Sequence, residues 1–188
     1  MTQLRLTAAL LFALGLAACD RPSPPPADAT PQAAPAWTAR LRLALTGEGL
    51  TAIVTGSGET QLLSFGRPKG QTLVTMTRVE PTPGQETLNS ECGAGPLAFV
   101  AWPGGLTLLF QEDRFAGWTV DKPGLITLDG IGVGSTRAAL LAARPTTTVE
   151  ESTLGTEFAV AEMGGLFDGK GPDAKITTLW AGVTCMFR

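Results

Sequence analysis

Apolar and polar residues alternate along several short stretches of this chain, which is the pattern of strands buried on one face. Leu41, Leu43 and Leu45 alternate with Arg40 and Arg42, and comparable runs recur at short intervals. Glycine and proline stand between these runs and favour turns. The pattern predicts strands over the ranges 41–45, 50–55, 61–65, 97–102, 106–111, 114–120, 157–160, 175–181 and 183–188.

Two stretches have the features of short helices. Pro68 can open the first, which we expect to end near Val79, because proline is favoured in a first helical turn. The second covers 136–144 and is rich in alanine and leucine, with Ser135 available as its N-terminal cap. The glycine pair at 164–165 is expected to form a turn.

These elements predict an α+β fold, with antiparallel sheets and two short helices in a single globular domain, 37–188. Phe-Gly at 65–66 and Ile-Gly at 131–132 each precede a predicted helix. This similarity suggests a tandem duplication of a helix-plus-sheet unit over 37–120 and 121–188. Chance similarity in a chain with 23 glycines is the alternative.

The first nineteen residues have the features of an export signal. Arg5 precedes an apolar run, 6–16, that is too short to cross about 30 Å of hydrocarbon as a helix. The sequence at 16–19, Leu-Ala-Ala-Cys, resembles the lipobox of bacterial lipoproteins. The resemblance implies that 1–18 is removed and that acyl chains on Cys19 anchor the protein in a lipid bilayer. An ordinary secretory signal, with an incidental cysteine, is the alternative.

The segment that follows the lipobox cannot form a packed core. Residues 20–36 contain six prolines and five alanines, a composition that favours extended polyproline geometry. We therefore interpret 19–36 as the lipidated cysteine and a tether. This organisation places the body in a bacterial cell envelope, facing the periplasm, and leaves open whether the inner or the outer membrane holds the anchor.

Two cysteines remain once Cys19 is acylated. In an oxidising compartment, Cys92 and Cys185 are most simply joined by a disulfide. The alternative is a redox-active pair, but the two residues are not spaced as C-x-x-C, and no histidine is present to lower a thiol pKa.

Composition excludes several functional classes. The chain has no histidine, which removes Ser-His-Asp and Cys-His catalysis and histidine-ligated metals, and we expect no cofactor or metal. A formal net charge of −3 argues against a nucleic-acid partner, which would require clustered lysine and arginine.

Two places in the body are candidate binding sites. Gly132, Gly134, Ser135 and Arg137 precede or open the second predicted helix and could cradle an anion, although the loop could equally be a simple turn before a capped helix. Trp102 stands beside a Pro-Gly-Gly turn and is the aromatic residue that we expect to be exposed as a partner contact.

The segment 131–140 resembles the helix-opening segment of a family of small envelope lipoproteins. This family includes the small accessory lipoprotein of the β-barrel assembly machinery, and its fold is shared with the β-lactamase inhibitor proteins. The resemblance implies a helix packed on an antiparallel sheet and a protein that acts by binding other proteins.

We therefore expect a membrane-anchored binding or scaffold module for an envelope protein, rather than an enzyme. One alternative is an inhibitor of an extracytoplasmic enzyme. Another is an envelope hydrolase that uses two carboxyl groups for acid–base chemistry. The candidate carboxylates for that alternative are Glu112, Asp113, Glu150, Glu151, Glu157, Glu162 and Asp168.

Overall fold

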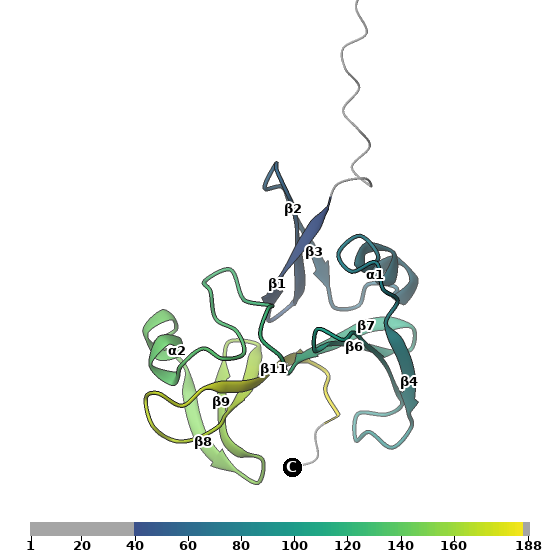
Figure 1. Ribbon diagram of the computed structural model, residues 1–188. Coiled ribbons are helices and arrows are strands. Elements are labelled where there is room, and N and C mark those ends of the chain that lie inside the picture. Colours follow the sequence, from purple (N-terminus) through teal and green to yellow (C-terminus); the bar gives the residue numbers. More distant parts are fainter. Residues whose placement is uncertain (1–39, 186–188) are drawn as a thin grey trace, which may run out of the picture. The chain divides into compact units, whose positions relative to one another are not determined.

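The computed structural model describes residues 40–185, which form eleven strands and two short helices (Figure 1). The structure is 10% helical and 47% strand, so the fold is mainly β. The α+β class predicted from the sequence is therefore wrong. The error arises because three strands lie in stretches that the sequence pattern assigns to turns and loops. Within residues 40–185, neither helix is long enough to cross a bilayer.

The first three strands form a sheet of their own. They are β1 (Leu41–Thr46), β2 (Gly49–Val54) and β3 (Thr60–Ser64), which pair antiparallel in the order β1-β2-β3. Leucines at alternate positions of these strands point into the core and are almost fully buried. This sheet has two faces of different character, because the residues between these leucines point the other way.

The remaining eight strands form a second antiparallel sheet in the order β4-β5-β6-β7-β11-β10-β9-β8. Their bounds are β4 (Gln85–Asn89), β5 (Leu97–Ala101), β6 (Leu106–Gln111), β7 (Arg114–Val120), β8 (Thr148–Ser152), β9 (Gly155–Val160), β10 (Met163–Phe167) and β11 (Ile176–Gly182). Helix α1 (Lys69–Met76) precedes β4, and helix α2 (Arg137–Ala143) precedes β8. A helix followed by four consecutive strands thus occurs twice, and β7 and β11 join the two sets. Sequence duplication between 37–120 and 121–188 stays a prediction.

One large apolar cluster holds the two sheets and both helices together. It includes Leu45 and Leu63 from the first sheet, Trp118 and Leu179 from the second, and Leu140 from α2. A smaller cluster lies on the other face of the eight-stranded sheet and surrounds the disulfide. The chain's contacts place all described residues in one compact unit.

Two predicted elements are wrong in detail. Gly164 and Gly165 do not form a turn but lie within β10. Residues 183–185 are not a strand, and the rest of the predicted strand 183–188 lies outside the described residues. The predicted signal peptide, Cys19 and the tether 19–36 also lie outside the described residues.

Candidate functional site

Two adjoining hollows lie along helix α1 and share Met76, Glu80 and Trp102. Their volumes are about 150 and about 230 Å³. We call the two together the α1 groove. Its lining residues come from α1 and the segment after it, from β1, β4, β5 and β6, and from the loop after β7; the ones used below are Leu73, Met76, Glu80, Gly84, Glu86, Val100 and Trp102.

Helix α1 supplies one wall of the groove. Pro68 precedes its first turn, and the hydroxyls of Thr72 and Thr75 donate to the carbonyls of Pro68 and Gln71 at 3.1 and 3.2 Å. These bonds satisfy the hydroxyls of two buried threonines, which would otherwise be costly in a core. The helix can therefore pack its threonine face inward.

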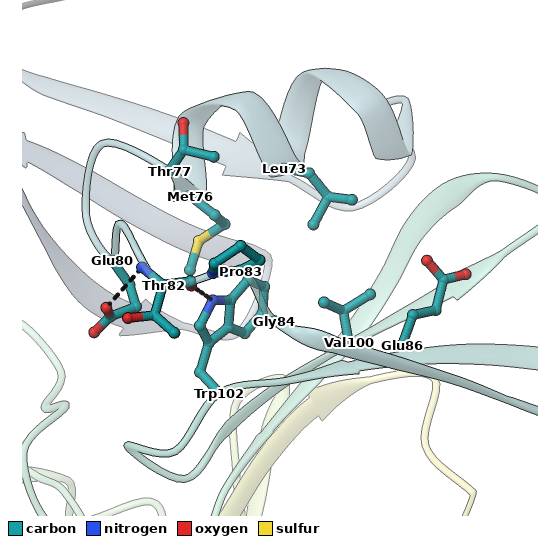
Figure 2. A pocket seen from close by; sticks show the side chains of 10 residues that line it. All are labelled: Leu73, Met76, Thr77, Glu80, Thr82, Pro83, Gly84, Glu86, Val100 and Trp102. Atoms are coloured by element: carbon teal, nitrogen blue, oxygen red, sulfur yellow. Dashed lines mark hydrogen bonds between the residues drawn. The ribbon is translucent and has the colours of Figure 1, made fainter.

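The opposite wall is the sheet, and Figure 2 shows Leu73 pointing from α1 toward Val100 and Met76 pointing toward Trp102. The indole nitrogen of Trp102 donates to the carbonyl of Thr82 at 3.1 Å, which fixes the ring between the two hollows. Gly84 lies against this ring: a β-carbon there would be 2.5 Å from Val100 Cγ1 and 2.8 Å from Trp102 Cε2. Glycine at position 84 thus lets the chain cross Trp102 at close range.

The rim of the groove is acidic. Glu80 accepts a hydrogen bond from the backbone nitrogen of Thr82 at 3.1 Å, and Glu86 forms an ion pair with Lys69 at 2.5 Å. Glu80 and Glu86 are the ionisable side chains among the residues that line the two hollows. Lys69 also lies 5.6 Å from the centre of the Phe110 ring, a cation–π contact that ties the start of α1 to β6.

The chemistry of the α1 groove is that of a binding site for apolar groups. Pockets for whole cofactors or drug-sized ligands have volumes of roughly 300–1,000 Å³, larger than either hollow. Each hollow instead matches one or two amino-acid side chains. Met76 lies at the bottom of both hollows, where it is buried in the core.

Trp102 is buried, and the prediction that it is exposed is wrong. Only 8% of the residue is accessible, because its ring packs under Gly84 and its nitrogen is bonded to Thr82. Its predicted role as a partner contact is untested. The groove itself follows from no single sequence pattern, since its walls come from segments that only the fold brings together.

The loop predicted to bind an anion has its amides engaged inside the protein. The backbone nitrogens of Gly134 and Arg137 donate to Ile176 and Ala174, and that of Gly132 donates to the Ser135 hydroxyl. Thr136, rather than Ser135, caps α2, with its hydroxyl accepting from Ala139 at 3.0 Å. The Arg137 guanidinium donates to the carbonyl of Lys170. These bonds engage the backbone donors of Gly132, Gly134 and Arg137 and one donor of the Arg137 guanidinium, and anion binding at this loop stays a prediction.

The candidate catalytic carboxylates are spread over several elements. Glu112 and Asp113 form the β6–β7 turn, and Asp168 accepts from the backbone nitrogen of Lys175. Glu150 and Glu157 lie opposite each other on β8 and β9, and Glu157 is buried. Glu151 forms an ion pair with Lys170, and the hydrogen bond from Lys170 lowers the pKa of the Glu151 carboxyl. Glu162 lies in the β9–β10 turn. Within the described residues, no three cysteine, aspartate or glutamate side chains gather as metal ligands.

The predicted disulfide between Cys92 and Cys185 is confirmed. It joins the segment after β4 to the segment after β11, across 93 positions of sequence. The bridge packs on Leu97 and Leu109, and the side-chain amide of Asn89 lies 3.7 Å from the Cys185 sulfur. The disulfide therefore covers the face of the eight-stranded sheet that is opposite to the α1 groove.

Comparison with known proteins identifies a fold but no family. No protein-family model and no curated protein matches the chain. The structure is similar to the crystal structure of the uncharacterized protein yfeY from Escherichia coli, with a TM-score of 0.50 and 7% sequence identity. The similarity covers 74% of this chain and 99% of that chain. At this identity, the likeness shows a shared fold alone.

Proposed function

We propose that this protein is a lipid-anchored binding module of the bacterial envelope, which holds an extended segment of a partner protein in the α1 groove. The observation that carries the proposal is the groove itself, which combines an apolar floor with an acidic rim. The lipobox resemblance at 16–19 and the tether 19–36 support anchoring at Cys19 and a position in the periplasm.

An extended peptide fits the groove better than a small molecule does. In an extended chain, alternate side chains point to the same side, so two of them can enter the two adjoining hollows. Strand β4 runs beside the groove and is an edge strand of the eight-stranded sheet, with four of its five residues exposed. Edge strands present backbone donors and acceptors that an added strand can use.

The rim indicates the composition of the bound segment. Glu80 and Glu86 flank the apolar floor, and Lys69 already neutralises part of that charge. A segment with apolar residues next to a lysine or arginine would complement both floor and rim. We therefore expect apolar residues at alternate positions of the partner's segment, together with a lysine or arginine.

The experiment that tests this function is photo-cross-linking from inside the groove. A benzophenone amino acid at position 73 should cross-link one envelope protein in living cells, at a single linear segment. A synthetic peptide of that segment should then bind the purified protein. Leu73→Glu should weaken peptide binding about tenfold, since it places a carboxylate in the apolar floor.

Val74→Glu is the matched control, because Val74 is the next residue of α1 and is 67% exposed. It should leave peptide affinity within about twofold of the original. Circular dichroism should show that both variants are folded. Equal effects at positions 73 and 74, or a cross-link that maps to no single linear segment, would contradict the proposed function.

A further inference from the structure

The outer face of the three-stranded sheet carries large apolar side chains among polar ones. Leu43, Leu45 and Leu63 point into the core, so the residues between them point away from it. Cross-strand register places Arg42 beside Ile53 on β1 and β2, and Leu62 opposite Thr51 on β3 and β2. Leu62 is 44% exposed.

The loop after β7 extends this face. The backbone nitrogen of Leu45 donates to the carbonyl of Ile126 at 2.9 Å, and Leu45 forms a parallel bridge with Thr127. Thr127 is buried, so its neighbours Ile126 and Leu128 point outward, where they are 48% and 70% exposed. The loop thus adds a fourth segment to the sheet and places two large apolar side chains on its outer side.

A shallow hollow of about 490 Å³ lies between the loop and the sheet, lined in part by Arg42, Ile53, Ile126 and Leu128. We call these four residues, together with Leu62, the outer apolar face. Three of the five exposed large apolar residues among the described ones belong to it. Surface apolar residues gathered in this way mark an interaction site rather than random exposure.

We infer that the outer apolar face docks on the surface of an anionic lipid bilayer. Two observations favour lipid over a second protein. One charged residue, Arg42, lines the hollow, and Arg40 precedes it by two positions, which suits phosphate headgroups; Asp129, which follows Leu128, is paired with Arg144. The chain outside the described residues also joins the body at this strand, so any anchor on that chain holds this face near the membrane.

The combination of apolar side chains and arginines is that of interfacial membrane contacts. Leucine and isoleucine enter the boundary between headgroups and acyl chains, while arginine stays at the phosphate level. An acyl anchor at Cys19 would keep the body near the bilayer, because only the 20 residues 20–39 separate Cys19 from the described body. A weak contact therefore suffices to orient the protein.

The test uses the mature chain 19–188 with Cys19→Ser, which carries no lipid, and vesicles of phosphatidylethanolamine and phosphatidylglycerol. We expect this protein to sediment with the vesicles at low salt and to be released by high salt. Vesicles of phosphatidylcholine alone should bind it far less. The double substitution Ile126→Glu and Leu128→Glu should lower the bound fraction about tenfold.

Leu88→Glu is the control, because Leu88 on β4 is 74% exposed and lies outside this face. It should leave vesicle binding unchanged. In a second measurement, the tryptophan fluorescence of Leu128→Trp should shift to shorter wavelength when vesicles are added, whereas that of Leu88→Trp should not. Absence of binding, equal losses at both sites, or dimerisation that depends on Leu128 would overturn the inference. Since no peptide is used, this inference and the proposed groove function can fail separately.

Discussion

At the scale of single residues, Gly84 is the position where the groove is most sensitive to an added atom. A β-carbon there would meet Val100 and Trp102 at less than 3 Å, so Gly84→Ala should lower the free energy of unfolding by about 1–3 kcal/mol. Gly70→Ala is the control: nothing lies within 4 Å of a β-carbon at that helical position, and alanine favours a helix by about 0.5 kcal/mol or more. In urea unfolding, the free energy of unfolding should therefore fall in Gly84→Ala and rise in Gly70→Ala. A change in the same direction in both variants would contradict the packing described for Gly84.

The ion pair of Asp129 and Arg144 gives a prediction about pH. Both carboxylate oxygens of Asp129 accept from the guanidinium at 2.8 Å, which holds the pKa of Asp129 far below its usual range and raises that of Arg144. Because the folded pKa is the lower one, the pair stabilises the protein above the unfolded value of about 3.9 and loses this effect as pH falls below it.

Asp129→Asn should therefore cost about 0.5–1 kcal/mol of stability near neutral pH, a small value because both side chains are partly exposed. The difference from the original protein should shrink in urea unfolding below about pH 4. Asp173→Asn, in an exposed loop, is the control for the loss of a carboxylate outside this ion pair. A difference that persists at low pH would mean that the substitution acts through packing rather than charge.

At the scale of elements, the disulfide joins the first strand of one four-strand set to the last strand of the other. It links the segment after β4 to the segment after β11, so its loss frees about ninety residues in the unfolded chain. Replacing both Cys92 and Cys185 by alanine should lower the free energy of unfolding by about 2–4 kcal/mol. A reducing agent should destabilise the original protein by a similar amount and leave the double variant unchanged. Equal sensitivity of both proteins to the reducing agent would exclude the bridge as the cause.

The sequence predicts the elements whose faces differ in polarity. The ranges 106–111 and 114–120 agree with β6 and β7, because alternating apolar residues surround a two-residue turn whose members both have positive φ. Strands β4 and β8 are missed because edge strands are polar on both sides and show no alternation.

Strand β10 is missed for a different reason. Gly164 lies under the ring of Trp180, and Gly165 lies under the ring of Phe158, at distances that leave no room for a β-carbon. Glycine in this strand therefore permits close packing rather than a turn. Local rules cannot distinguish these roles, since the distinction depends on aromatic residues that arrive from β9 and β11. The α1 groove is unpredictable from sequence for the same reason.

At the scale of the whole molecule, the two proposals divide the body between two surfaces. The α1 groove would receive a partner segment, while the outer apolar face would rest on lipid. The two surfaces adjoin, because Leu43, Val79, Gly124 and Leu125 line a hollow of each. A partner segment in the groove would therefore lie next to the surface that rests on lipid.

The anchor itself gives the last prediction. If Cys19 is acylated, the original protein should have an intact mass that begins at this residue with added acyl chains, and only detergent should extract it from membranes. Each buried methylene contributes about 0.8 kcal/mol, so several chains bind far more tightly than one surface patch does. Cys19→Ser should therefore be released from membranes by high salt alone. Cys92→Ser is the matched control, and it should still need detergent, because its thiol holds no lipid. Detergent-dependent extraction of Cys19→Ser would contradict anchoring at this cysteine.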